Sequence, residues 1–246
     1  FGFAGLSFLE LGSNPVNYYR ASDPVRVAIE FVDARLAGTT TLEIVVDSGE
    51  VNGALEPEFL SGLRTVQDWL DSVEGVGMSV SLADYVMELR RALRGGAAGE
   101  RRIPDSRAEV AQLLLLLDDP EELERMVANI DYQETRITAT VRATESEKLT
   151  RRIPELEELL AETFPPPATT EATGMSKLIA NMDRYLLHSA TRSMGLAFIT
   201  VLIFMTLALR SVRLGLFSMI PNILPVALVI GVMGWCGIAL DPGTTM

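Results

Sequence analysis

The chain has 246 residues, of which 48% are hydrophobic and 22% are charged, and its formal net charge is −12. Three of the 21 basic residues but only one of the 33 acidic residues lie beyond residue 190, so the acidic excess belongs to the first 190 residues. A surface of that sign repels phosphate backbones and argues against a nucleic-acid partner. The one cysteine, Cys236, lies in an apolar run and indicates neither redox compartment.

The first 22 residues read as a leader from an upstream membrane span. Phe1 to Leu9 is apolar but lacks the basic flank and the cleavage site of a signal peptide. This stretch fits either the trimmed end of a span or a first strand, and a short strand near residues 7–11 is expected.

The next segment predicts a β-α-β unit. Pro24 is placed to begin a helix whose apolar positions recur at helical spacing, namely Val25, Ala28, Ile29, Val32 and Leu36. Residues 41–47 then predict a strand, 57–73 a second helix and 76–80 a second strand.

Residues 81–130 predict a helical insertion, with a further short helix after Asp118. Residues 135–141 alternate strictly and predict a half-buried strand, followed by a helix over 146–160 and an extended stretch over 168–172. Two β-α-β units in succession indicate an α+β domain over residues 23–173, of the ferredoxin-like, split β-α-β type.

Residues 174–246 predict a stem helix followed by two transmembrane helices. Apolar residues recur at helical spacing from Met175 and nothing breaks the pattern before Met194, so a continuous helix is expected to enter the first span. The spans are expected at about 189–209 and 214–240, each long enough to cross a bilayer.

The charges between the two spans predict their orientation. The connection Arg210–Arg213 carries two arginines and no acid, which places it in the cytoplasm by the positive-inside rule. Residues 1–188 are then extracytoplasmic, and the protein is integral to the inner or plasma membrane.

Several motifs resemble the predicted-exporter branch of the RND (resistance-nodulation-division) superfamily, which is akin to lipid-exporting permeases. The motifs are residues 13–19 (SNPVNYY), 38–47 (GTTTLEIVVD), 81–85, 102–106, 210–216 (RSVRLGL), 220–225 (IPNILP) and 237–246. The resemblance suits the second of the family's two repeats. It implies that residues 23–173 are a porter domain, that the remaining repeat and helices of the permease are partners, and that the proton-relay acids lie on a helix beyond Met246. The chain is therefore expected to be a fragment.

Within the spans, Pro221, Asn222 and Pro225 are the candidate residues for a transport path or hinge. Prolines free backbone carbonyls that a polar side chain or water must satisfy, although Asn222 could equally sit near the cytoplasmic interface. His188 stands alone and predicts no metal site, and Glu155, Glu157, Glu158 and Glu162 fit a solvated helix face. No catalytic group or cofactor motif is found, so no enzyme is expected.

Two functional hypotheses follow from the resemblance and the spans. The first is part of a proton-driven exporter of hydrophobic or lipid-like solutes, which would also contact membrane lipids. The second is a membrane-anchored binding or assembly module without a transport cycle, such as a sterol-sensing or protein-translocation relative.

Overall fold

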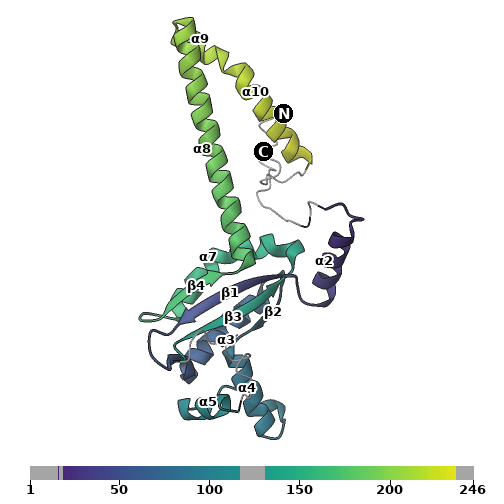
Figure 1. Cartoon of the computed structure of the whole chain (residues 1–246), viewed down its shortest axis with the longest axis vertical. Coiled ribbons are helices and arrows are strands. Elements are labelled where there is room, and N and C mark those ends of the chain that lie inside the picture. The colour runs from purple at the N-terminus through teal and green to yellow at the C-terminus, as the bar shows by residue number, and fades with distance from the viewer. Residues whose placement is uncertain (1–15, 17–18, 117–130, 237–246) are drawn as a thin grey trace. The chain divides into compact units, whose positions relative to one another are not determined.

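A computed structural model of the chain describes residues 16, 19–116 and 131–236 (Figure 1). The chain divides into two compact units, one spanning Asn14–Leu178 and the other beginning at Ile179. The strand expected near residues 7–11, the helix expected after Asp118 and the expected end of the second span at 237–240 lie outside the described residues.

The first unit alternates helices and strands in the order that the sequence predicts. Its elements are α2 (Pro24–Arg35), β1 (Thr40–Asp47), η3 (Gly53–Leu55), α3 (Pro57–Ser72), β2 (Val76–Val80), α4 (Leu82–Leu93), η4 (Ala98–Glu100), α5 (Arg107–Leu114), β3 (Glu134–Val141), η5 (Ala143–Glu145), α7 (Ser146–Thr163) and β4 (Thr169–Thr173).

The four strands form one sheet in the order β2-β3-β1-β4, and every neighbouring pair is antiparallel. In the two central strands Ile44 lies opposite Ile137. β1 and β2 are joined through α3 and are separated in the sheet by β3, while β3 and β4 are joined through α7 and are separated by β1. The unit is therefore a mixed α+β fold on a four-stranded antiparallel sheet.

One face of the sheet is buried, because apolar side chains alternate along β1 and β3. The fully buried members are Leu42, Ile44, Val46, Ile137, Ala139 and Val141. The apolar faces of α3 and α7 pack against them through Leu60, Leu63, Val66, Leu70, Leu149, Leu156 and Leu160. This core fixes the sheet and the two helices relative to each other.

The sharpest close approach in this unit explains a glycine in β2. A Cβ atom built on Gly77 would lie 1.7 Å from the carbonyl oxygen of Ala37, and the β2–β3 register shifts at this residue. Only glycine lets the end of the α2–β1 connection come this close to the strand.

Helices α4 and α5 lie between β2 and β3 in the chain, where the insertion was predicted (Figure 1). Ser81 caps α4 in a capping box, in which its hydroxyl and the carboxylate of Asp84 each accept from backbone N–H groups. Arg90 is buried at 3% exposure and forms ion pairs with Glu100 and Glu109, at 2.6 and 3.2 Å. The insertion is therefore held both by these ion pairs and by buried apolar side chains of α4 and α5, among them Leu82, Val86 and Val110.

The apolar face predicted for the first helix forms as part of α2 but is not buried. Val25, Leu36 and also Phe31 are exposed, Phe31 at 58%. Asp33 is the buried residue of α2. Helical spacing indicates an apolar stripe but does not say what covers it, and no described element covers this one.

The apolar helices are α8 (Met175–Leu209), α9 (Val212–Ser218) and α10 (Ile220–Cys236), and all but the first turn of α8 belongs to the second unit. The continuous helix predicted from the stem into the first apolar stretch is present as the 35-residue helix α8. The second span differs from the prediction, because it begins at Val212 and divides into α9 and α10 around Met219. Two stretches, His188–Leu209 and Val212–Cys236, are long and apolar enough to cross a membrane.

Candidate functional site

The two spans expose large apolar side chains along most of their described length. Examples are Leu196, Phe204, Phe217, Leu224 and Trp235. Such surfaces need lipid or further helices around them, because water does not solvate them favourably. If the site has a part inside the membrane, that part lies on these helices.

The connection between the spans is shorter than predicted. α8 ends at Leu209, Arg210 adopts a left-handed backbone with φ +49°, and Ser211 is the N-cap of α9. Arg213 thus lies in the first turn of α9, and only Arg210 and Ser211 are outside a helix. Both arginines still lie at the same end of the hairpin.

A glycine permits the two helices to cross closely just after this turn. A Cβ atom built on Gly215 would lie 2.3 Å from Oγ1 of Thr206 and 3.1 Å from its Cα. Gly215 is buried, although the residues that flank it in α9 are exposed. The close crossing of the two helices therefore requires glycine, which has no side chain, at position 215.

The predicted candidates Pro221 and Asn222 lie in the first turn of α10, directly after the break between α9 and α10 at Met219. Met219 N donates to Leu216 O, so the carbonyl of Gly215 loses its helical partner and instead accepts from the hydroxyl of Ser218 at 2.7 Å. Asn222 N donates to Met219 O, and its side-chain Nδ2 donates to the carbonyl of Ser218 at 3.3 Å. Two side chains thus replace two backbone donors at the break.

The prolines account for the rest of this local geometry. Pro221 lies in the first turn of α10, where its missing N–H is least costly, and Pro225 lies inside the helix. The structure thus assigns Asn222 a bond within its own span. Neither a transport path nor a hinge motion follows from that bond, and both stay predictions for Pro221, Asn222 and Pro225.

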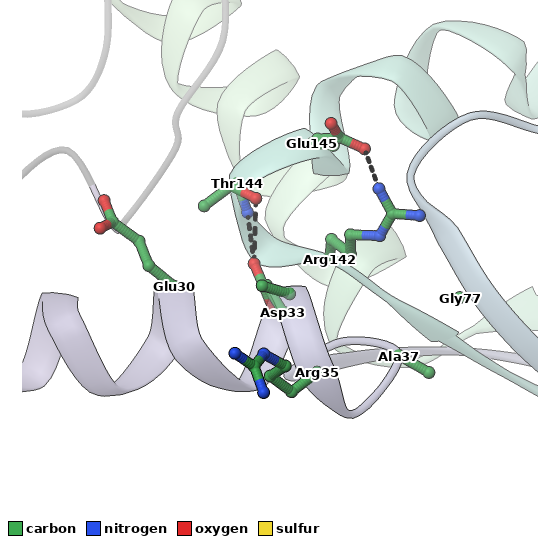
Figure 2. Close-up of a pocket in the computed structure, with 9 residues that line it drawn as sticks. Glu30, Asp33, Arg35, Ala37, Gly77, Arg142, Thr144 and Glu145 are labelled. Atoms are coloured by element: carbon green, nitrogen blue, oxygen red, sulfur yellow. Dashed lines mark hydrogen bonds and ion pairs between the residues drawn. The ribbon is translucent and has the colours of Figure 1, made fainter.

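A polar cavity of about 610 Å³ lies on the first unit, between the end of α2 and the β3–α7 connection (Figure 2). Asp33 points from α2 toward Thr144, whose N–H and hydroxyl both donate to it at 3.0 Å. The hydroxyl of Thr39 donates to the other carboxylate oxygen, also at 3.0 Å. This buried carboxylate fastens α2 to η5 and to the connection that leads into β1.

The other charges near this cavity largely form pairs among themselves. Arg142 bonds Glu145 at 3.0 Å, and Lys148 lies 3.5 Å from the same carboxylate and also bonds Glu74. The pKa of Glu74 is lowered, mainly by the hydrogen bond from Lys148 and then by its charge. Arg35 instead lies over the ring of Phe31 at 5.6 Å. These contacts are structural, and they show no arrangement typical of catalysis.

No group of three or more His, Cys, Asp or Glu residues within the described ranges is placed to hold a metal ion. His188 is exposed in α8, and the acids Glu155, Glu157 and Glu158 lie on the exposed side of α7. Sequence reasoning missed Gly215, Ser218 and Asp33. A single glycine, serine or aspartate forms no sequence pattern that would mark it as important. The role of each of these three residues follows only from its contact with another part of the structure.

The sequence matches the model of the MMPL family over residues 50–240, which includes most of the first unit and both spans. The chain belongs to the MMPL family. This confirms the resemblance to the RND superfamily. Members of this family are transporters.

The chain is also similar to a protein of Methanocaldococcus jannaschii, MJ1562, that is named only as a membrane protein. The two are 24% identical over 252 residues, which cover 98% of this chain and 62% of the relative. The chain thus spans less than two thirds of that relative's length. Both comparisons agree with the two apolar helices in assigning this MMPL protein to a membrane.

Proposed function

We propose that this chain is part of a proton-driven RND-type exporter of hydrophobic or lipid-like solutes. The observation that carries the proposal is α8, one 35-residue helix that begins directly after β4 and includes a complete candidate span. In this proposal a folded unit outside the cytoplasm responds to movements of the membrane helices through α8. Membership of the MMPL family favours this function over a membrane anchor without a transport cycle.

The first unit has the features expected of a ferredoxin-like porter domain. Its strand order β2-β3-β1-β4, with α3 and α7 as the two crossover helices, agrees with the split β-α-β arrangement. The insertion of α4 and α5 falls between the two β-α-β halves. Exposed apolar residues of α2, such as Phe31, are available for a partner surface.

The remaining repeat and helices of the permease are the proposed partners. Two helices with exposed apolar surfaces cannot enclose a pathway, and the M. jannaschii relative extends well beyond the matched region. The stretches His188–Leu209 and Val212–Cys236 contain no Asp or Glu. Carrying protons through a membrane requires titratable side chains, so we place the relay on the partner helices.

For the orientation, we propose that Arg210 and Arg213 lie in the cytoplasm and that residues 1–188 lie on the other side. Both arginines are at the turn of the hairpin, where the positive-inside rule applies most directly. The acidic first unit would then be extracytoplasmic.

The test is transport of a fluorescent acyl lipid by vesicles with an imposed pH gradient. Vesicles that contain the intact permease are expected to move the lipid only while the gradient lasts, and a protonophore is expected to abolish the movement. Vesicles with this chain alone should behave as empty vesicles. If the permease still moves the lipid in the presence of the protonophore, the proton-driven mechanism is contradicted. If this chain alone moves the lipid, the proton relay does not lie on the partner helices.

A further inference from the structure

The first turn of α8 is seated on the first unit through its polar residues. Ser176 is 3% exposed, and its hydroxyl lies 3.5 Å from Oγ1 of Thr40 at the start of β1. The hydroxyl of Thr40 in turn donates to the carbonyl of Val141 in β3 at 2.9 Å. The helix therefore begins against β1, at a residue of β1 that is itself bonded to β3.

Lys177 adds a contact to a second element. Its ammonium group forms an ion pair with Glu157 in α7, and its side chain is only 15% exposed. By contrast Met175 and Leu178, on either side of these polar residues, are exposed. In this first turn, polar groups therefore make the contact with the unit, and the two apolar side chains do not.

Gly174 fixes the chain just before this turn. Its φ of +93° is unfavourable for other residues, and a Cβ atom would lie 2.9 Å from Glu43 N and 3.0 Å from Thr41 O. The backbone therefore comes directly against β1 where α8 begins. Gly174, Ser176 and Lys177 together make three independent contacts with β1 and α7.

We infer that Gly174, Ser176 and Lys177 form a joint that holds the first turn of α8 against β1 and α7. This rests on the proposed function, in which the joint passes movements of α8 to β1 and α7. Polar and steric contacts of this kind specify one geometry, whereas an apolar contact would tolerate several. Lys177 and Glu157 are positioning residues for transport, because they act through the helix and not on a solute.

The test uses charge reversal at the ion pair. Spin labels are attached to cysteines that replace Glu162 in α7 and Asn181 in α8, in a Cys236→Ser background, and the distance between them is measured by double electron–electron resonance in lipid nanodiscs. Lys177→Glu should broaden the distance distribution, because it places two carboxylates together. Adding Glu157→Lys should narrow the distribution again. Arg102→Glu, which breaks an exposed ion pair in the insertion, is the matched control and should leave it unchanged.

The same variants, in the intact permease without labels, are assayed for lipid export. Export should fall severalfold in Lys177→Glu and return in the double reversal. The joint is overturned if Lys177→Glu leaves the distance distribution unchanged, or if the double reversal fails to restore it. Either result overturns the joint even if the permease exports normally. A broadened and restored distribution supports the joint even if the unaltered permease exports nothing, and in that case the proposed function fails.

Discussion

At the residue scale, the two most deeply buried charged residues of the first unit are each met by several hydrogen-bond or ion-pair partners. Among the described residues two charged side chains are buried, Asp33 with three hydrogen bonds and Arg90 with two ion pairs. Each connects separate elements, α2 with η5 in one case and α4 with η4 and α5 in the other. Buried charge of this kind is costly to disrupt from one side.

Replacing Arg90 by Ala should therefore destabilise the first unit by about 3 kcal/mol. The loss is expected at the lower end of the range for buried pairs, since Glu100 and Glu109 both still reach water. Chemical denaturation followed by circular dichroism measures it. Arg94→Ala is the control, because Arg94 is exposed and lies 3.4 Å from the same Glu109. Its effect should stay below about 1 kcal/mol, and an equal loss in both variants would contradict the argument.

At the element scale, hydrophobic period was a good guide to strands and helices but not to their surroundings. The strict alternation of residues 135–141 predicted both β3 and its buried face. Successive side chains of a strand point to opposite faces of the sheet, so apolar residues at every second position lie on one face. The sequence also predicted the apolar stripe on α2, but it did not indicate which surface, if any, covers that stripe. The second span was predicted as one helix, since an apolar run does not reveal where Pro221 and the turn at Met219 divide it.

The candidate site was less accessible to sequence reasoning than the fold. Asn222 could be selected as an amide inside a span, but its bond to the carbonyl of Ser218 depends on the helix break. Gly215 could not be selected at all, because its role is defined by Thr206 on another helix. Contacts between segments determine both roles, and a local pattern does not contain them.

The crossing of α8 and α9 gives a prediction of its own. Gly215→Ala should destabilise the hairpin by about 1–3 kcal/mol, because the new methyl group would overlap Thr206. Unfolding in increasing SDS, followed by far-UV circular dichroism, reports this loss. Gly195→Ala is a matched control in α8, where a Cβ atom would meet nothing within 4 Å. If both variants unfold at the same SDS fraction, the helices do not cross closely at Gly215.

At the scale of the whole molecule, a membrane hairpin and an acidic α+β unit belong to one chain, and α8 is common to both. Family membership places the chain in a family of transporters, and the proposal adds the driving force, the solute and the orientation. An orientation can be measured without knowing any solute. It is therefore the first of these three to test.

Single cysteines in a Cys236→Ser background test that orientation. A membrane-impermeant maleimide should label Ser211→Cys, at the hairpin turn, only from the cytoplasmic side. It should label Ala98→Cys, an exposed position in the insertion, only from the opposite side. Labelling of both positions from the same side would rule out the proposed topology.

The central claim is that α8 couples the first unit to the membrane spans during export, and a proline in α8 tests it most directly. Met182→Pro removes a backbone hydrogen bond and costs about 3 kcal/mol or more locally. Met182→Ala is the control, because Met182 is exposed and alanine keeps the helix intact. With equal membrane insertion of both variants of the intact permease, lipid export by Met182→Pro should fall to the level seen with a protonophore. Export by Met182→Pro equal to that of Met182→Ala would contradict the coupling.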